Sequence, residues 1–368
     1  MKTVKYLLSF VLLTLCCSVH AQNKTKYNPM NEAVPVLHGQ AWQSELKGSY
    51  HRIPDRLESK CSKNVWSLAG NTAGEKLVFR TNSENITVRF INSSKSFAMR
   101  HMPATGMSGV DMYGLNDKGE WTTCNPNFQY VFGDTCRYNY ADLSYSAETK
   151  AKGREYHLYL PLYNGVEWME ISVDEGSLFS YVLPSKEKPI LIYGTSIAQG
   201  ACASRPGMAW TNIVDRTVNH PILNLGFSGS AKMEPAMQEV LNEVDACLYI
   251  LDNMENMEAK NVYESSLHCC HLLRQSHPEA PILLVEHSGQ PDTSIREKAK
   301  DYQNVNNELQ KVYQTLKKEN FKNLYYLTCE EIGLDTESFV EGIHPNDYGM
   351  RINARAISQK IKEIFKEK

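Results

Sequence analysis

The sequence predicts an α/β domain with a parallel sheet in the second half of the chain, preceded by an all-β sandwich. The 368 residues are enough for two domains of ordinary size. Residues 22–184 contain short runs of alternating apolar and polar residues, whereas residues 185–368 alternate buried strand-like runs with helical patterns. A polar stretch bounded by Pro184 and Pro189 separates the two halves.

The first half contains β-strand patterns and no long amphipathic helix. Its strands are predicted from alternating runs at residues 76–80, 85–90, 156–160 and 168–173. Short strands at such spacing are typical of an antiparallel sandwich. Trp42, Trp66 and Trp168 could form a sugar-stacking surface, but we favour the interpretation that they fill the core of this sandwich.

The second half alternates strands with helices, which predicts a parallel sheet covered on both faces. A helix face is marked by Met237, Val240, Leu241 and Val244, and a last helix by the apolar residues between 357 and 365. A polar helix is expected at residues 294–318. Buried strands are expected at residues 190–193, 247–251, 282–285 and 324–327.

The N-terminus has the pattern of a secretory signal peptide. Lys2 and Lys5 precede an uncharged apolar run at residues 6–17, and Val19 and Ala21 suit a cleavage site after residue 21. A membrane anchor or a lipoprotein is the weaker alternative, because the apolar run is short for a bilayer. We therefore expect export of residues 22–368 to the periplasm or the medium, with no later membrane span.

Charge and cysteine content limit the other classes. A net charge of −3 gives no basic surface for nucleic acid. Ten cysteines include Cys16 and Cys17 of the leader, and the spacing of the others is too irregular for a disulfide framework. Cys124 and Cys136 could pair across a hairpin, and Cys202 is interpreted as loop packing.

Ser196 is the candidate nucleophile. It follows the first strand of the predicted parallel sheet, and such sheets form their sites at the carboxyl ends of the strands. A tight turn between strand and helix exposes a hydroxyl and directs backbone N–H groups towards an oxyanion. Ala198 stands where a G-x-S-x-G motif would have its second glycine, so this loop alone also fits an ordinary connection.

His344 is the candidate general base, with Glu341 as the group that orients it. The glutamate precedes the histidine by three residues and could accept a hydrogen bond from one ring nitrogen. The other nitrogen is then free to take the serine proton. Pro345 is expected to begin the final helix, which leaves His344 on the loop before it.

Oxyanion donors are expected from two further loops. The N–H of Gly226 could approach a ligand closely because this residue has no side chain. Asn253 and Asn256 both follow the next buried strand, and one could donate its amide to an oxyanion while the other caps a helix.

Other residues offer alternatives to this site. The run His268-Cys269-Cys270-His271 contains zinc-ligand types, but on a helix the histidines and cysteines turn to different faces, so no metal is predicted. His287 follows the third strand and is a rival base. Asp111 is interpreted as structural, with ligand contact as the alternative.

Four segments taken together resemble the SGNH/GDSL hydrolase superfamily. They are G-T-S-I-A-Q-G with Ser196, N-L-G-F-S-G with Gly226, L-D-N-M-E-N-M with Asn256, and E-G-I-H-P-N-D with His344. The resemblance implies a three-layer flavodoxin-like hydrolase domain and favours Asn256 and His344 over Asn253 and His287. It also implies an oxyanion hole formed by the N–H groups of Ser196 and Gly226 with the Asn256 amide.

The first half is similar to the N-terminal G-x-D-L-Y domain that often precedes such hydrolases. Residues 108–113 (S-G-V-D-M-Y) and 160–165 (L-P-L-Y-N-G) carry this similarity, which implies a jelly-roll-like module. Two residues depart from the family pattern. Glu341 stands where aspartate is usual, so a Ser–His dyad is an alternative, and Glu255 replaces a proline beside the expected oxyanion donor.

The sequence therefore predicts an exported serine esterase that needs no cofactor. A short acyl ester of a carbohydrate is the expected substrate. The alternatives are an acyltransferase or thioesterase at the same site, and a non-catalytic glycan-binding protein on a decayed hydrolase scaffold. The oligomeric state is not predicted.

Overall fold

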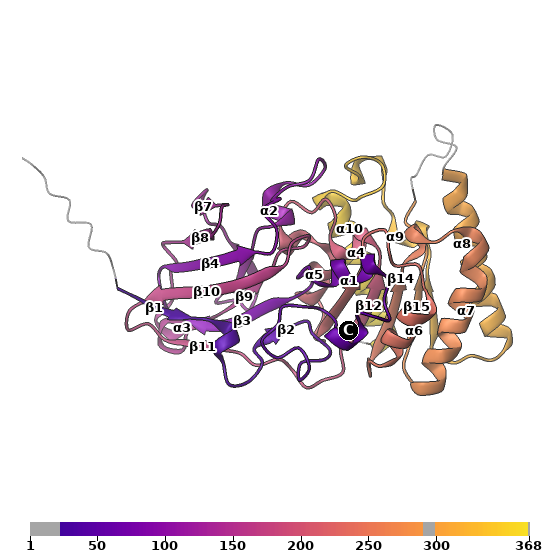
Figure 1. Cartoon of the computed structure of the whole chain (residues 1–368), viewed down its shortest axis with the longest axis horizontal. Coiled ribbons are helices and arrows are strands. Elements are labelled where there is room, and N and C mark those ends of the chain that lie inside the picture. The colour runs from indigo at the N-terminus through magenta and orange to yellow at the C-terminus, as the bar shows by residue number, and fades with distance from the viewer. Residues whose placement is uncertain (1–22, 290–298, 367–368) are drawn as a thin grey trace, which may run out of the picture.

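The computed structural model describes residues 23–289 and 299–366 (Figure 1). The predicted signal peptide and the first residues of the helix expected at 294–318 lie outside these ranges. Two antiparallel sheets occupy one end of the elongated molecule and a parallel sheet with its helices the other. The two fold classes predicted for the halves of the chain are therefore confirmed.

The first half folds as a sandwich of two antiparallel sheets. Their facing side chains form one apolar core, which includes Leu77, Phe79, Val88, Phe90 and Ile171. The first sheet has the order β1 (Lys24–Tyr27), β10 (Val166–Asp174), β4 (Ile86–Asn92), β8 (Cys136–Tyr140) and β7 (Tyr130–Val131). The second has the order β11 (Phe179–Tyr181), β3 (Lys76–Thr81), β9 (Arg154–Tyr159), β5 (Asp111–Leu115) and β6 (Trp121–Cys124), with β2 (Leu37–His38) beside β3.

Short helices connect these strands. They are η1 (Pro29–Asn31), η2 (Asp55–Leu57), α1 (Lys63–Ala69), α2 (Ala104–Met107) and α3 (Ala147–Lys152). Ser62 and Ser146 cap α1 and α3 by accepting hydrogen bonds from Val65 and Thr149 N–H groups.

The second half contains a five-stranded parallel sheet of flavodoxin-like order. Its strands are β13 (Ile222–Gly226), β12 (Ile190–Gly194), β14 (Leu248–Asp252), β15 (Ile282–Val285) and β16 (Leu324–Leu327), in that order. Strand β13 had not been predicted, because Asn224 interrupts its apolar run. The chain passes from β12 to β13 in one direction across the sheet and from β13 to β14 in the other. The switch point of this topology therefore lies at the carboxyl ends of β12 and β14, beside the loop that follows β13.

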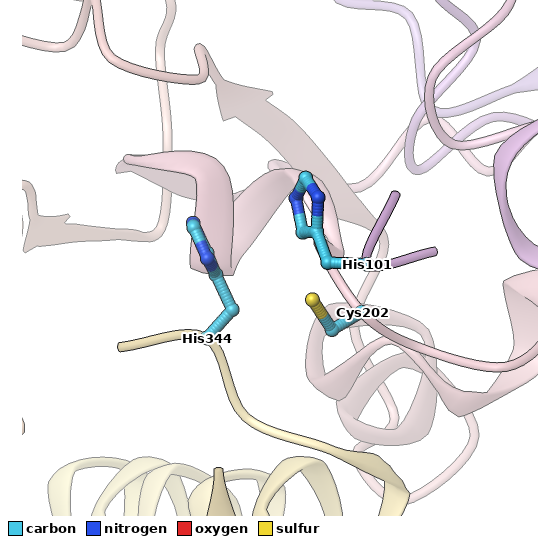
Figure 2. A group of neighbouring side chains, drawn as sticks. All are labelled: His101, Cys202 and His344. Carbon is cyan, nitrogen blue, oxygen red and sulfur yellow. The ribbon is translucent and has the colours of Figure 1, made fainter. Parts of the chain in front are cut away.

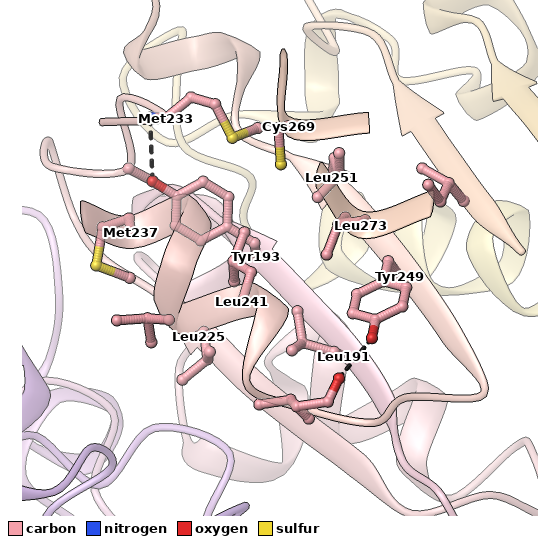
Figure 3. Close-up of a cluster of buried hydrophobic side chains, with 14 of the residues drawn as sticks. Leu191, Tyr193, Leu225, Met233, Met237, Leu241, Tyr249, Leu251, Cys269 and Leu273 are labelled. Atoms are coloured by element: carbon pink, nitrogen blue, oxygen red, sulfur yellow. Dashed lines mark hydrogen bonds between the residues drawn. The ribbon is translucent and has the colours of Figure 1, made fainter. Parts of the chain in front are cut away.

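Helices cover both faces of this sheet. One face packs against α6 (Pro235–Asn242), α7 (Ala259–Ser276) and α8 (Ala299–Lys318), with Tyr193, Leu225 and Leu251 in the layer between (Figure 3). The other packs against α4 (Ser196–Gln199), α5 (Trp210–Asp215), α9 (Cys329–Ile332) and α10 (Asp347–Phe365). Three 3₁₀ turns complete the domain: η3 (Pro206–Met208), η4 (Met254–Asn256) and η5 (Thr336–Ser338).

Most of the segment between β2 and β3 packs on the parallel sheet, although Tyr50 lies in the sandwich core. Trp42 and Trp66 lie with the cluster that covers β12 and β13. Trp168 lies on an outer face of the sandwich, where the Arg89 guanidinium sits 5.8 Å from its ring centre. The interpretation that these tryptophans fill the sandwich core is therefore wrong: Trp42 and Trp66 lie in a segment that leaves the sandwich, and the Trp168 side chain lies on the outward face of β10.

Arg52 anchors this segment to the edge strand β13. Its side chain is fully buried and donates to the carbonyls of Gly226 at 2.8 Å, Asn224 at 3.2 Å and Leu68 at 2.7 Å. These three carbonyls satisfy a charge that would be costly to bury without partners.

The eight described cysteines are free thiols. Cys124 ends β6 of one sheet and Cys136 begins β8 of the other. The disulfide that the sequence left possible between them does not form, because the two cysteines lie in different sheets and not in one hairpin. None of the helices in the described part of the chain has both the length and the apolar character of a membrane span.

Candidate active site

Ser196 is the first residue of α4 and lies just beyond the carboxyl end of β12. Thr195 caps the helix, with its hydroxyl accepting from the Ile197 N–H at 3.3 Å. A side chain at Gly194 would place its Cβ 2.5 Å from that of Ala198, so the sharp turn requires glycine at this position. Ser196 as a whole residue is 8% exposed.

His344 reaches Ser196 from the loop before α10. The distance between Ser196 Oγ and His344 Nε2 is 2.8 Å. The loop is closed by a bridge between Phe339 and Pro345 and by the Val340 N–H, which donates to the His344 carbonyl at 2.9 Å. Asn346 caps α10, so the helix begins at Asp347, two residues after the predicted start.

Glu341 holds the other side of the imidazole. Its Oε1 lies 2.5 Å from His344 Nδ1 and accepts from the His344 backbone N–H at 2.9 Å. One carboxylate oxygen therefore fixes both the ring and the backbone of the same residue. This arrangement favours the tautomer with the proton on Nδ1, which leaves Nε2 as the acceptor for the serine hydroxyl.

Gly226 lies in a different position from the one expected. It is the last residue of β13 and pairs with Gly194 of β12. Its N–H donates to the Asn224 Oδ1 at 2.8 Å inside the fully buried strand. This N–H is therefore already engaged. A Cβ at this position would lie 2.5 Å from the Gln199 nitrogen, so the glycine allows α4 to approach β13.

Asn256 lies against the turn that follows β13. In the orientation that satisfies both ends of its amide, the Asn256 oxygen accepts from the N–H groups of Gly229 at 3.3 Å, Ser230 at 3.1 Å and Ala231 at 3.2 Å. The last two N–H groups also donate to the Phe227 carbonyl, at 3.0 and 3.1 Å. In the opposite orientation the amide nitrogen donates to the same carbonyl at 3.3 Å. The N–H of Gly229, a residue of φ +65°, is thus a partner of the Asn256 oxygen.

The Glu255 carboxylate lies between Ser288 and Thr195, the residue before the nucleophile. The carboxylate accepts from the Ser288 N–H at 3.2 Å and lies 3.5 Å from Thr195 Oγ1. Burial raises the pKa of Glu255 to about 7, and burial together with Glu255 raises that of the neighbouring Asp252. The Glu255 carboxyl, which lies beside the expected oxyanion donors, is therefore only partly ionised at neutral pH.

The sandwich contributes residues to this region that the sequence did not indicate. Tyr163 donates its hydroxyl to the Ser196 carbonyl at 3.2 Å, and the His101 ring lies 5.5 Å from that of His344. Asp111, interpreted as structural, accepts from Arg205 Nη1 at 2.5 Å across the two halves. Tyr163 belongs to the L-P-L-Y-N-G segment, which was a signal; no sequence pattern pointed to His101.

The rival residues lie elsewhere. His287 is buried, which lowers its pKa to about 3, and its Nδ1 accepts from the Gly289 N–H at 3.0 Å. His268 Nδ1 bonds to Gln238 at 2.6 Å, whereas His271 lies 3.2 Å from Glu319. His268 and His271 of the His-Cys-Cys-His run thus have separate partners, one on α6 and the other just after α8.

A hollow of about 910 Å³ lies between α5 and α10, and none of the candidate catalytic residues lines it. It is lined by Met208, Ile213, Thr217, Asp347, Tyr348, Arg351, Ile352, Ala354, Arg355, Ser358, Gln359 and Lys362.

Comparison with known proteins agrees with this geometry. Residues 187–362 match the model of the GDSL-like lipase/acylhydrolase family, and residues 25–179 match the GxDLY domain, the N-terminus of SGNH-hydrolase-type esterases. The chain therefore belongs to the SGNH/GDSL-type esterases that carry this N-terminal domain, and it is a carboxylic ester hydrolase by class. A search of curated proteins gave no match.

Solved structures share the two-domain fold. A protein from Bacteroides ovatus described as a GDSL-like lipase is 29% identical, with a TM-score of 0.82 over 94% of this chain and 98% of that one. The salicylyl-acyltransferase SsfX3 from a tetracycline biosynthetic pathway is 18% identical, with a TM-score of 0.68 over 93% and 98%. A family two carbohydrate esterase from Cellvibrio japonicus is 9% identical, with a TM-score of 0.51 over 80% and 89%.

Proposed function

We propose that the chain is an exported serine esterase that removes short acyl groups, acetyl foremost, from carbohydrates. The observation that carries the catalytic part is the continuous hydrogen-bonded row of Ser196, His344 and Glu341, with distances of 2.8 and 2.5 Å. Export rests on the leader pattern of residues 1–21. The carbohydrate substrate rests on the export and on the fold shared with carbohydrate esterases.

The proposed reaction is acyl transfer to water in two steps. His344 Nε2 takes the Ser196 proton as Oγ attacks the ester carbonyl, and the imidazolium then gives that proton to the leaving alcohol. Water, deprotonated by the same nitrogen, releases the acid from the acyl-enzyme. Glu341 is opposite the positive charge that forms on His344 in each step. No cofactor takes part in this scheme.

The proposed oxyanion hole consists of the N–H of Ser196 and the amide nitrogen of Asn256. The N–H of Gly226, expected as a further donor, donates instead to Asn224. The N–H of Gly229 donates to the Asn256 oxygen at 3.3 Å, a contact that orients the Asn256 amide. Neutral donors fixed before the reaction stabilise an oxyanion without reorganisation.

The first test compares the purified mature chain with its Ser196→Ala variant and a Ser185→Ala control, in which an exposed serine of the linker is lost. The substrates are nitrophenyl acetate, acetylated oligosaccharides and a longer lipid ester. We expect turnover of the acetyl esters by the wild type and the control, and none above background by the variant. Turnover of the lipid ester alone would contradict the acetyl-carbohydrate proposal.

A second candidate function is acyl transfer to an alcohol other than water, as the name of the structurally similar salicylyl-acyltransferase suggests. Both reactions pass through the same acyl-enzyme. Adding sugar alcohols during ester turnover separates them, because a transferase yields the new ester while a hydrolase yields free acid. Absence of turnover together with retained glycan binding would support the third reading, a binding protein on a decayed hydrolase scaffold.

A further inference from the structure

Three side chains of metal-binding type gather beside the catalytic serine. They are His101 from the sandwich, Cys202 from the loop after α4, and His344. One nitrogen or sulfur atom from each lies within 4.8 Å of the other two. Figure 2 shows the Cys202 sulfur pointing between the two imidazole rings, so that the three donors face a common space.

Hydrogen bonds of the backbone hold the segments that carry His101 and Cys202, the two residues beside His344 in space. His101 sits in a tight loop closed by hydrogen bonds between Met99 and Met102, at 3.0 and 3.3 Å. Met102 is buried in the core that covers the α4 face of the parallel sheet. Cys202 has φ +68° and follows Ala201, whose N–H donates to the Ser196 carbonyl at 2.8 Å. The packing of the two domains therefore brings His101 and Cys202 together.

Two imidazoles and a thiol are the ligands of zinc and not of magnesium or calcium, which prefer oxygen. Zinc binds sulfur at about 2.3 Å and nitrogen at about 2.0–2.1 Å, so tetrahedral donors lie roughly 3.4–3.6 Å apart. The cluster must therefore close by about 1 Å. Rotation of the partly exposed His101 ring supplies part of this movement, and small rotations of Cys202 and His344 supply the rest.

We propose that His101, Cys202 and His344 bind one zinc ion, with water in the fourth position, and that the bound ion reversibly blocks the site. Both nitrogens of His344 are engaged, Nε2 by Ser196 and Nδ1 by Glu341. A metal on either nitrogen removes the general base or its orienting carboxylate. Zinc binding itself does not depend on the proposed esterase function, whereas the inhibition rests on it.

Zinc binds sulfur as the thiolate. The zinc–sulfur bond therefore forms as the Cys202 proton passes to the buffer, and no electron is transferred.

The experiment is a calorimetric titration of the untagged mature chain with zinc chloride. Wild type is compared with the variants His101→Ala and Cys202→Ser. The control variant is His271→Ala, which removes a half-exposed histidine on the far helix α7. We expect one zinc per chain for wild type and control, and binding at least tenfold weaker in each of the two site variants. Titration in buffers of different ionisation enthalpy gives the number of protons released.

Esterase rates are measured in parallel, as the ratio with and without saturating zinc within each protein. We expect zinc to lower the esterase rate strongly in the wild type and the control, and less in the two site variants. Absence of zinc binding up to about 1 mM, where the binding energy falls to roughly 4 kcal/mol, overturns the proposal, as does binding unchanged in both site variants. Zinc binding without any ester turnover would support the site and refute the proposed function instead.

Discussion

Glu341→Gln tests whether the carboxylate contributes to catalysis or merely accompanies a Ser–His dyad. Glutamine keeps an oxygen where Oε1 now accepts from His344 Nδ1 and from its backbone N–H. The substitution removes the negative charge and preserves the shape of the loop. The change therefore isolates the effect of charge on the imidazolium that forms in the transition state.

The size of the effect follows from the geometry. A hydrogen bond to a charged group contributes about 1.5–3 kcal/mol and a neutral one about 0.5–1.5, so their difference is roughly 1–2 kcal/mol. The Glu341 side chain is 38% exposed, and water screens its charge, which favours the lower part of that range. We expect kcat to fall by about 5- to 30-fold with KM unchanged, because His344 is positive only in the transition state.

Steady-state kinetics on nitrophenyl acetate measures the effect, with Glu337→Gln as the control. Glu337 is an exposed glutamate of the neighbouring turn η5, and its substitution should leave both constants unchanged. A kcat for Glu341→Gln within twofold of wild type would refute the reasoning and establish a dyad. A loss as large as that of Ser196→Ala would show that exposure does not screen this carboxylate.

Three further predictions concern the residues around the nucleophile. Glu255→Gln should raise the free energy of unfolding, measured in urea, by on the order of 1–2 kcal/mol at pH 8 and by little at pH 4. The reason is that burial raises the pKa of Glu255 to about 7, so its ionisation destabilises the wild-type fold as the pH rises from about 4.5 to 7. An equal gain at both pH values would contradict this. Asp111→Ala removes the carboxylate partner of Arg205, which keeps its hydrogen bond to Tyr113, and leaves the buried Gly207 N–H unpaired. It should cost about 2–4 kcal/mol, measured by the same method, whereas no change would show that the two halves do not depend on this pair. Tyr163→Phe removes one hydrogen bond to the Ser196 carbonyl and should lower stability by about 1 kcal/mol and kcat severalfold; an unchanged kcat would mean that the tyrosine does not position the serine.

Local patterns were sufficient to predict most of the fold. The buried strands at Ile190–Gly194 and Ile282–Val285 are uninterrupted apolar runs, and α10 has the spacing of one buried face. Strand β13 was missed because Asn224 lies in its middle. That asparagine is buried because its side chain bonds to the Gly226 N–H and the Ala198 carbonyl, and such compensation depends on contacts far apart in the sequence.

The candidate site was predictable where neighbours in the sequence are neighbours in space. Glu341 and His344 are three residues apart, and their contact follows from one loop. The contacts of His101 with His344 and of Tyr163 with Ser196 could not be predicted, even though Tyr163 lies in a recognisable segment, because these contacts depend on how the two halves pack. Gly226 illustrates the opposite error. The sequence predicted that a ligand would approach this glycine closely, whereas the structure shows that the backbone of α4 lies there instead.

The burial of Arg52 against β13 has a consequence for how the protein can be divided. The guanidinium covers carbonyls on an edge strand that pairs only with β12, and an uncovered edge is a template for pairing with another chain. A fragment of residues 185–368 lacks Arg52 and the tryptophans beside it. We expect that fragment to self-associate, even though it retains Ser196 and His344. The hydrolase half therefore cannot be exchanged as an independent module, because the N-terminal half of the chain covers the edge strand that would otherwise pair with another molecule.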